Sequence, residues 1–484
     1  MLRFFAIERR AEGCKRSQAA ALFFSLLLIL LLSSLAAQAA VPAVVGSSST
    51  SFASGLGANP NKMVFDAAGN LFVLDTSNSR ILKFPANGSA RVDIPVKQPA
   101  AGLSVDTSGN LYYCDLWGSD VWEVPYTAGQ YGTAQKLIDS SDGGAINALL
   151  GTYWLATMDF VQYASDAGND YFMLLDFAGA TYQVKRAKVG GALSAKKIEG
   201  IAGGWGDGDE LAVDSQGNVF AVYGNAVYKI SGVSTVTVTK ISDIPNAKHI
   251  GLDAAGNVYV SNTIDNLVTV IPNEKGTLNA SDKYIVYSGT VIANVAFDPK
   301  GRMLLPVWDA INYLSFSNVQ TPAKAVGAAS NPATISYAFN ADVTPSFQYR
   351  SKGANGEFST PGGASCGDTY SAGQDCSCSA SYTAGQSCTT KVTATAVVPG
   401  ARMGAVLMLD ASNNLASMMN VTGMGVGGGL VLDPGTQVSY SSAASKPYAL
   451  AMDSAGNLYV ADTDATSILK IPAGGGTALT SVLD

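Results

Sequence analysis

One short phrase recurs along this chain and most constrains what the chain can fold into. The phrase opens with Asp, passes through two variable residues to a Gly-Asn pair, and ends in an apolar run such as LFVLD. Its Gly stands at positions 69, 109, 168, 217, 256 and 456, and a further, altered copy carries Gly301-Arg302. Apart from the last interval, the copies are spaced by about 40 to 60 residues, which is the range of β-propeller blades.

The phrase has the chemistry of a tight turn between two strands. An Asp at the first position accepts backbone N–H groups, and a Gly supplies the left-handed residue, where a side chain would cost on the order of 1 kcal/mol. In the third copy we take Asp159 as the turn Asp, with an enlarged turn before Gly168. The other predicted structural turns pair Asp66 with Gly69, Asp106 with Gly109, Asp214 with Gly217, Asp253 with Gly256, and Asp453 with Gly456.

The strand before each turn carries large residues on one face and small residues on the other. Met63 and Phe65 flank Val64 in the first copy, and Leu450 and Met452 flank Ala451 in the last. Because neither face carries charge, both faces should be covered, as in sheets stacked around an axis. The sequence therefore predicts an all-β fold with a β-propeller of seven blades, or of six as the alternative.

The segment PNKMVFDAAGNLFVLDTSNSRILKF resembles the NHL repeat, including Asp75, Asn78, Arg80 and Ile81, and PYALAMDSAGNLYVADTDATSILKI is similar to it. The resemblance implies an exported bacterial type of propeller, although seven copies depart from the family's usual six blades. Residues 48–53 look like the outer strand of a blade. They are expected to complete the last blade of the ring, in competition with the C-terminal segment TALTSVLD.

An insert at 318–428 interrupts the repeats. It resembles immunoglobulin-like, Hydin-type domains through Cys388, Gly400, the Arg402-Met-Gly404 run and the Gly423-x-Gly425 exit. It departs from them at Ala394 and Ala396, where such domains carry an aromatic residue and a proline. The resemblance implies an inserted β-sandwich. The expected domains are a signal peptide at 1–39, propeller blades at 40–317, the insert at 318–428, and a last blade with ring closure at 429–484.

Four cysteines of the insert form two tandem C-x9-C units. We predict the disulfides Cys366–Cys376 and Cys378–Cys388. The alternatives are Cys366–Cys378 with Cys376–Cys388, or a zinc site, which C-x-C spacing disfavours. Cys114 is expected to be a buried strand thiol rather than a nucleophile.

The N-terminus has the order of a secretory signal: basic residues, an apolar run from about 19 to 35, and the small-x-small site Ala37-Gln-Ala39. We expect a secreted or periplasmic protein without a membrane span after cleavage; an uncleaved anchor is the alternative. The net charge is −7 and basic clusters are absent from the sequence, which argues against nucleic acid as a partner. We expect a monomer.

The candidate binding residues open the innermost strands. Counting back four from each repeat Asp gives Lys62, Gly102, Leu155, Glu210, His249, Asn294 and Ala449. These positions should ring one mouth of the axial channel, where Lys62, Glu210, His249 and Asn294 are polar; solvated strand ends are the simpler interpretation. Tryptophans near predicted turns, namely Trp117, Trp154, Trp205 and Trp308, are candidate stacking platforms, above all Trp117 and Trp205, or else packing residues.

The sequence favours a binding scaffold over an enzyme. His249 is the one histidine of the chain, so a three-histidine metal site cannot form, and at most one Ser-His pairing is available. We therefore predict a non-enzymatic scaffold for a protein or glycan partner, without catalytic residue, metal or cofactor. The alternatives are a lactonase- or lyase-like enzyme that uses Glu210, His249 and a metal, or a structural component of an envelope or matrix.

Overall fold

The computed structural model describes residues 41–57, 60–97, 100–115, 120–139, 155–176, 180–189, 191–201, 208–274, 276–352, 356–361, 370–427, 446–453, 457–464, 466–472 and 479–482. The predicted signal peptide at 1–39 lies outside these residues. The chain divides into two units, one up to Val426 and one from Gly427. Among the described residues, none forms a helix long and apolar enough to cross a membrane.

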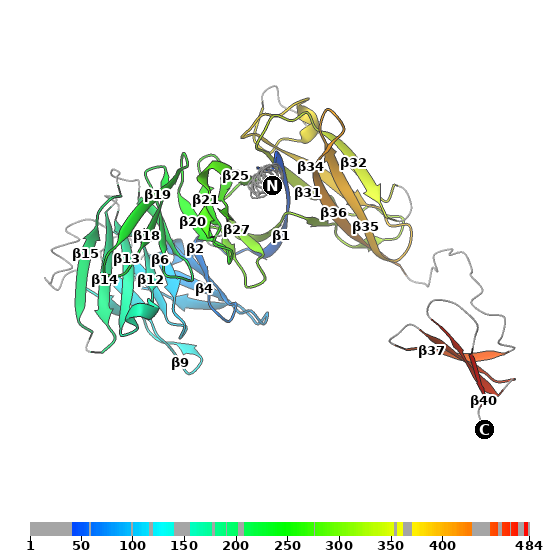
Figure 1. Ribbon diagram of the computed structural model, residues 1–484, viewed down its shortest axis with the longest axis horizontal. Helices are drawn as coiled ribbons and strands as arrows, with labels where there is room; N and C mark the ends of the chain where they lie inside the picture. Colours follow the sequence, from blue (N-terminus) through cyan, green and yellow to red (C-terminus); the bar gives the residue numbers. More distant parts are fainter. Residues whose placement is uncertain are drawn as a thin grey trace, which may run out of the picture. The chain divides into compact units, whose positions relative to one another are not determined.

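Three four-stranded antiparallel sheets form blades one to three of a propeller (Figure 1). Blade one consists of β2 (Pro60–Phe65), β3 (Leu71–Asp75), β4 (Arg80–Phe84) and β5 (Val92–Pro95). Blade two consists of β6 (Ala100–Val105), β7 (Leu111–Asp115), β8 (Val121–Val124) and β11 (Gln135–Ile138), and it carries the hairpin β9 (Tyr126–Thr127) and β10 (Gln130–Tyr131). Blade three consists of β12 (Leu155–Val161), β13 (Asn169–Asp176), β14 (Thr181–Ala187) and β15 (Leu193–Ile198).

Blades four to six repeat this plan. Blade four consists of β16 (Gly208–Val213), β17 (Val219–Tyr223), β18 (Ala226–Ser231) and β19 (Thr237–Asp243). Blade five consists of β20 (His249–Leu252), β21 (Val258–Asn262), β22 (Leu267–Ile271) and β25 (Tyr284–Ser288), with the hairpin β23 (Asn273–Glu274) and β24 (Thr277–Leu278). Blade six consists of β26 (Ala296–Phe297), β27 (Met303–Val307), β28 (Ala310–Ser315) and β1 (Val44–Ser54).

The ring closes with six blades. The inner strands contact one another in the order β2, β6, β12, β16, β20 and β26, and β26 contacts β2. The outer strand of blade six is the N-terminal β1, which pairs with β28 from Ser48 to Ser54. The seven-blade prediction and the assignment of ring closure to 429–484 are therefore wrong. The six-blade alternative is confirmed, and so is the expectation that residues 48–53 complete the last blade of the ring.

The repeated phrase forms the turn between the first two strands of a blade. In blade one, Gly69 has φ 83° and donates its N–H to the carbonyl of Asp66 at 3.0 Å, and Asp66 Oδ1 accepts the N–H of Asn70 at 2.8 Å. The Asn70 side chain then accepts the N–H of Ala86 at 3.0 Å. The side chains of Asn110 and Asn257 accept the N–H groups of Tyr126 and Asn273 in the same way, so in blades one, two and five the phrase shapes the hairpin and ties it to the end of the third strand. The equivalent glycines 109, 217 and 256 have φ 90°, 80° and 79°; Gly456 lies outside the described residues.

A β-sandwich follows the ring and shares a strand with it. Its first sheet contains β31 (Ala333–Phe339), β34 (Ser387–Ala394) and β33 (Phe358–Ser359), and β31 pairs with the Val44–Ser48 half of β1. Its second sheet contains β29 (Asn318–Gln320), β30 (Lys324–Ala325), β32 (Ser346–Ser351), β35 (Gly400–Leu409) and β36 (Leu415–Val426). Buried side chains from both sheets form one core, so the two domains are joined through β1 (Figure 1).

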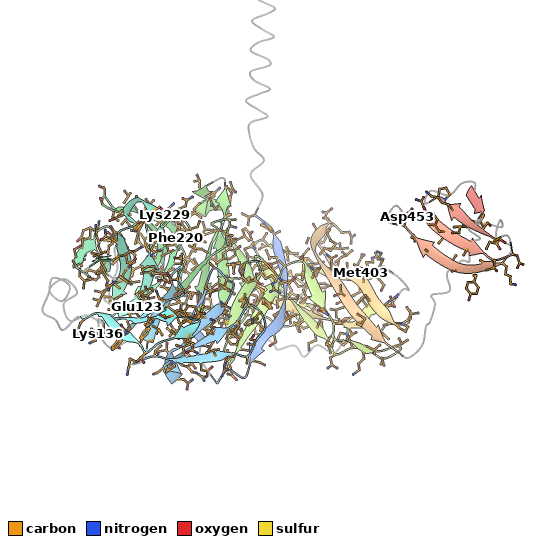
Figure 2. The ribbon with its side chains drawn as sticks, turned by 90° about the horizontal axis from the view of Figure 1, so that it is seen from below. Glu123, Lys136, Phe220, Lys229, Met403 and Asp453 are labelled. Carbon is orange, nitrogen blue, oxygen red and sulfur yellow. A yellow bond between two sulfur atoms is a disulfide. The ribbon has the colours of Figure 1, made fainter. Side chains whose placement is uncertain are left out.

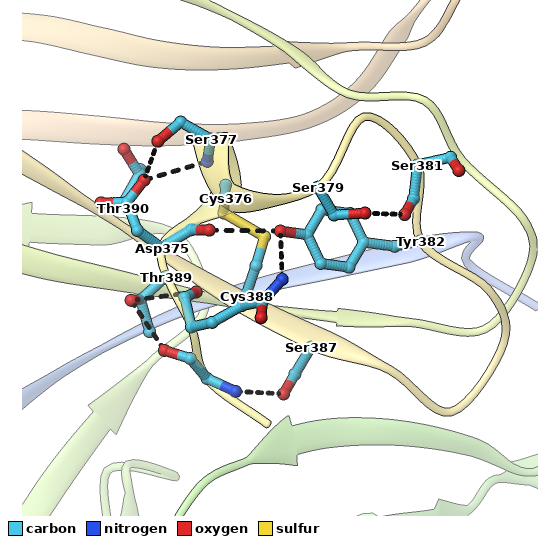
Figure 3. The surroundings of a disulfide bond; sticks show 12 residues. Asp375, Cys376, Ser377, Ser379, Ser381, Tyr382, Ser387, Cys388, Thr389 and Thr390 are labelled. Carbon is cyan, nitrogen blue, oxygen red and sulfur yellow. Dashed lines mark hydrogen bonds between the residues drawn. A yellow bond between two sulfur atoms is a disulfide. The ribbon is translucent and has the colours of Figure 1, made fainter. Parts of the chain in front are cut away.

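The sandwich carries a disulfide that corrects the predicted pairing. Cys376, in a 3₁₀ turn at Cys376–Cys378, is bonded to Cys388 in β34 (Figure 3). Cys378 is also disulfide-bonded, and Cys366 lies outside the described residues. The preferred pairing of Cys366 with Cys376 and of Cys378 with Cys388 is therefore wrong. The second pairing contains the observed bond.

The last copy of the phrase forms a separate four-stranded sheet from Gly427 onward. It consists of β37 (Pro447–Met452), β38 (Leu458–Asp462), β39 (Ser467–Ile471) and β40 (Leu479–Val482) in antiparallel order. Asp453 Oδ1 accepts the N–H of Asn457 at 2.9 Å, as in the ring blades. The sheet therefore has the strand order and turn chemistry of a blade.

Candidate functional site

The inner strands of four blades each bring one polar residue to a common level in the channel. In each of these blades the residue pairs with the fourth residue after the turn Asn. The residues are Lys62 in blade one, Asp159 in blade three, Glu210 in blade four and His249 in blade five. In blade two, Gly102 occupies a strand irregularity at φ 60°, where a Cβ would lie 2.4 Å from the backbone of blade three. Equivalent registers in a closed ring place these residues at one height around the axis. We call Lys62, Asp159, Glu210, His249 and Asn294 the axial ring.

Asp159 belongs to this ring, which corrects the sequence reading of blade three. The turn Asp of that blade is Asp166, which accepts the Asn169 side chain at 2.7 Å and the Tyr171 hydroxyl. Asp106 makes the same contacts with Asn110 and Tyr112 in blade two. Leu155, the predicted ring member, is a buried core residue. The run Asp166-Ala-Gly-Asn was the signal in the sequence that identifies the turn.

Lys62 crosses the axis from blade one. Its Nζ lies 3.2 Å from Glu210 Oε1 and 3.6 Å from Asp159 Oδ2, and it donates to the carbonyl of Leu211. Blades one and four are opposite each other in a six-membered ring, so this side chain spans the channel. The side chains of Lys62 and Glu210 are 4% and 3% exposed, so the ion pair is withdrawn from solvent.

The other ring members are fixed by neighbouring blades. Glu210 Oε2 lies 2.9 Å from His249 Nδ1 and accepts the N–H of Ile250 at 3.2 Å. Asp159 Oδ1 accepts the Ser104 hydroxyl at 2.6 Å. Every described charged group of the axial ring therefore has a partner within the protein.

Asn294 closes the ring between blades six and one. Its Oδ1 accepts the N–H of Met63 at 2.8 Å, and its Nδ2 donates to the Met63 carbonyl at 3.0 Å. These two bonds satisfy backbone groups on the inner edge of β2 that strand pairing leaves open. Asn294 thus acts at the seam where the ends of the ring meet.

Burial and charge oppose each other in this cluster. Burial alone would lower the pKa of Lys62, but the negative charges of Glu210 and Asp159 outweigh it and raise that pKa. Burial raises the pKa of Asp159, and the Lys62 ammonium partly offsets this effect. Lys62 is thus held as a cation between two carboxylates. His249, whose side chain is 19% exposed, is the most solvent-accessible member of the Lys62–Glu210–His249 chain.

A cavity of about 410 Å³ lies at the mouth of the channel on the side where the inner strands begin. Its lining includes Asn61, Thr76, Thr263, Asn266, Ile292 and Trp308. Trp308, in the turn between β27 and β28, is 64% exposed and has φ 41°. A bulky residue in the left-handed region is a backbone outlier of a kind that clusters at functional sites.

A second cavity of about 510 Å³ begins at the axial ring and runs toward the repeat turns. Its lining includes Lys62, Asp159, Phe160, Asp214 and Asn294. Because Lys62 crosses the axis where this cavity begins, it separates the inner cavity from the mouth. The mouth is therefore the side of the channel on which Trp308 is available to a ligand.

The structure brings together Lys62, Glu210 and His249, and it places Asn294 in the same ring. It describes Trp308 as an exposed aromatic residue, whereas Trp117, Trp154 and Trp205 lie outside the described residues. A binding role for these residues stays a prediction. In the part of the chain that the structure describes, groups of three or more His, Cys, Asp or Glu side chains suited to a metal ion are not found.

No protein-family model matches the chain, and no curated protein matches it in sequence. Solved structures similar to it include virginiamycin B lyase from Staphylococcus aureus with quinupristin, at 12% identity and TM-score 0.38, which covers 54% of this chain and 81% of that one. A gluconolactonase from Xanthomonas campestris has 16% identity and TM-score 0.38, with coverage of 57% and 96%. Regucalcin from Agrobacterium tumefaciens, a calcium-binding protein, has 13% identity and TM-score 0.38, with coverage of 55% and 91%. At these scores the propeller assignment rests on the strand pairing itself.

Proposed function

We propose that this protein is an extracytoplasmic binding scaffold whose propeller presents its mouth to a glycan. The observation that carries the proposal is Trp308, an exposed indole at the rim of a cavity lined by hydroxyl and amide side chains. An aromatic face stacks on the apolar face of a sugar, and amide and hydroxyl groups pair with its hydroxyls. A peptide partner is the alternative ligand for the same surface.

The axial ring supports this mouth from below. Lys62 ties blade one to blade four, and Asn294 ties blade six to blade one. These contacts fix the starts of the inner strands, from which the mouth residues next to them project. In this account the ring positions the mouth and does not bind the ligand itself.

The expected compartment follows from the disulfide. The bond between Cys376 and Cys388 is of a kind that persists in oxidising compartments. Together with the signal-like N-terminal sequence, it supports a place outside the cytoplasm. Periplasm and extracellular space both fit.

The test is a glycan and peptide array probed with the purified chain, followed by titration of Trp308 variants. Trp308→Ala should weaken binding to an array glycan about tenfold, a loss of about 1.4 kcal/mol, while Trp308→Phe keeps most of the affinity. Phe316→Ala is the matched control, because Phe316 is another exposed aromatic residue, 38% accessible, that does not line the mouth. Full binding by Trp308→Ala would end the assignment of the mouth, and peptide hits without glycan hits would replace the ligand class.

A second candidate, an enzyme of the lactonase or lyase kind, rests on the Glu210–His249 pair. The 2.9 Å contact uses His249 Nδ1 and leaves Nε2 free of that contact on a partly exposed ring. A carboxylate that orients an imidazole in this way can support general base catalysis. Lactone turnover that is lost in His249→Gln but kept in Trp308→Ala would favour the enzyme over the scaffold.

A further inference from the structure

The outer strand of blade one has a free edge. β5 pairs with β4 on one side, and in the part of the chain that the structure describes no strand pairs with its other side. Val96, just after β5, donates its N–H to the carbonyl of Ser79, just before β4, at 3.0 Å. Because backbone groups alternate in direction along a strand, Asp93 turns both its N–H and its carbonyl away from β4, and Pro95 turns its carbonyl away. These groups are open to a further strand.

A cavity of about 640 Å³ runs along this edge. One wall consists of residues 92–97, the other consists of residues 129–134 of blade two, and Lys83 lies at the end where β5 begins. The second wall comes from the β9–β10 hairpin (Figure 1) and leads into β11, on which Figure 2 labels Lys136. Six residues of extended chain span about 20 Å. A cavity with a free strand edge along one wall therefore suits an extended chain, and we call it the β5 slot.

The first wall of the β5 slot is basic. The stretch from Arg80 to Lys97 contains four basic residues and one acidic residue, in a chain whose net charge is −7. The acidic residue, Asp93, is already paired, with Arg80 Nη1 at 2.6 Å and with Arg91 Nε at 2.8 Å. Neither Lys83 nor Lys97 forms an ion pair with a described carboxylate, and Lys97 is exposed. The slot therefore offers two ammonium groups to a ligand that carries carboxylates.

Aromatic rings hold the Lys83 ammonium at the slot. Its Nζ lies 5.6 Å from the ring centre of Phe72, 5.2 Å from that of Tyr126 and 5.1 Å from that of Tyr131. All three distances are within the about 6 Å over which a ring attracts a cation. Tyr126 and Tyr131 belong to the β9–β10 hairpin, so Lys83 also joins blade one to the second wall. The rings position the charge without neutralising it, so a carboxylate can still pair with it.

We propose that the β5 slot binds an extended acidic peptide, which adds to β5 as a fifth, antiparallel strand of blade one. The peptide residue opposite Asp93 exchanges two backbone hydrogen bonds with it, and the residue opposite Pro95 donates its N–H to the proline carbonyl. Acidic side chains near the two ends of the bound stretch pair with Lys83 and Lys97. This surface is separate from the mouth at Trp308 and goes beyond the glycan site proposed there.

The edge strands of this chain do not match the slot. β37 and β40, the edge strands of the C-terminal sheet, contain no acidic residue. The outer strands β11, β15 and β25 of the ring contain none either, and Asp243 at the end of β19 is paired with Lys240 at 2.6 Å. A strand from this chain or from a second copy therefore leaves the two lysines without carboxylates. A separate acidic peptide supplies both the backbone groups and the charges.

Isothermal titration calorimetry of the full chain with a defined probe tests the proposal. The probe is a blocked six-residue peptide in which valine and threonine alternate between two terminal glutamates. The wild type should bind it, and should bind a version with terminal lysines at least about tenfold more weakly. Of two versions that are N-methylated at one or the other set of alternate residues, one should bind much more weakly, because alternate N–H groups face β5. Equal binding by these two versions, or no binding of the probe at about 1 mM, would overturn the proposal.

Variants of the chain separate the charges from the backbone edge. Lys97→Glu should weaken binding of the probe about tenfold. Lys324→Glu is the matched control, because it makes the same change at an exposed lysine of the sandwich, and it should leave binding unchanged. Asp93→Pro removes the outward N–H and no bond to β4, so it should lose binding, whereas Asp93→Asn keeps that N–H and should bind at least as tightly as the wild type.

Melting temperatures show that each variant is folded. Full binding by Lys97→Glu and Asp93→Pro would contradict the slot as the site. Peptide binding that is lost in Trp308→Ala would contradict it too, because the peptide would then lie at the mouth. Loss of glycan binding in Trp308→Ala, with peptide binding kept, supports two separate sites.

Discussion

The six ring blades and the C-terminal sheet contain the same repeated phrase but differ in what surrounds them. In blade five, the Tyr259 hydroxyl donates to Asp253 at 3.1 Å, and in the C-terminal sheet Tyr459 donates to Asp453 at 3.1 Å. The turns therefore agree in detail. Yet Met63 is 1% exposed in the ring and its equivalent Leu450 is 67% exposed. The phrase specifies a hairpin locally, and neighbouring blades supply the burial.

The axial ring adds a second difference between these regions. Lys62 in blade one and Ala449 in the C-terminal sheet share a register, each opposite the fourth residue after the turn Asn. Lys62 is buried between two carboxylates, whereas Ala449 is exposed. The ring therefore uses this position to link blades across the axis.

The largest expected effect on the free energy of unfolding comes from replacing the ring residue at this shared position. Lys62→Ala leaves the buried carboxylates of Glu210 and Asp159 without a counter-ion, and it should cost about 3–5 kcal/mol of unfolding free energy. Ala449→Lys at the equivalent exposed position should change stability by less than about 0.5 kcal/mol. Urea unfolding followed by tryptophan fluorescence measures both. A cost below about 1 kcal/mol for Lys62→Ala would show that the network contributes little.

The next effect compares Met63 of blade one with its equivalent Leu450 of the C-terminal sheet. Met63→Ala opens a cavity between blades one and six and should cost about 2–5 kcal/mol. Leu450→Ala removes a mostly exposed side chain and should cost about 0.5 kcal/mol or less in dilute solution. Equal losses for the two variants would mean that both faces are covered alike.

A smaller effect separates two turns of the ring. Gly69 and Gly301 have φ 83° and 75°, so valine at either site should cost about 1–2 kcal/mol. A Cβ at Gly69 would lie 3.1 Å from Pro299 Cγ, whereas at Gly301 it would meet nothing within 4 Å. Gly69→Val should therefore have the lower melting temperature. The reverse order would show that neighbouring contacts do not add to the backbone strain.

The smallest effect is a pH dependence of the ring. The pKa of Lys62 is raised in the folded protein, so its contribution to stability is fully present below its ordinary pKa of 10.5 and is lost as pH rises through the raised value. The stability difference between wild type and Lys62→Met should hold from pH 8 to about 10 and narrow above 10.5. Unfolding curves at these pH values measure it. A constant difference up to pH 11.5 would argue against a buried cation.

The hairpins and the ring-closing strand could be predicted from the sequence because the residues that specify them are close together in the chain. Asp66, Gly69 and Asn70 lie within five residues, and residues 48–53 carry a readable strand pattern. The hydrogen bond from the Ala86 N–H to the Asn70 side chain could not be predicted, since it depends on where the third strand ends. Asp159 was misread because an enlarged turn shifts the count from Asp to strand.

The number of blades and the disulfide pairing depend on spatial proximity. Seven copies of the phrase suggested seven blades, but a copy joins the ring only if a neighbour can receive it. The pairing of Cys376 with Cys388 depends on a 3₁₀ turn lying beside β34, and cysteine spacing alone left two pairings open. In both cases the missing information was which segments lie side by side.

Amide hydrogen exchange tests most directly whether two copies of the repeated phrase are buried to different extents. The peptides to compare are 60–65 in β2 and 447–452 in β37. Both strands pair with one neighbour in their own sheet, so a difference between them reports the burial that adjacent blades supply. The account predicts exchange at least about 100-fold slower for 60–65 than for 447–452. Equal protection of the two peptides would contradict it, because β37 would then be packed like an inner strand of a closed ring.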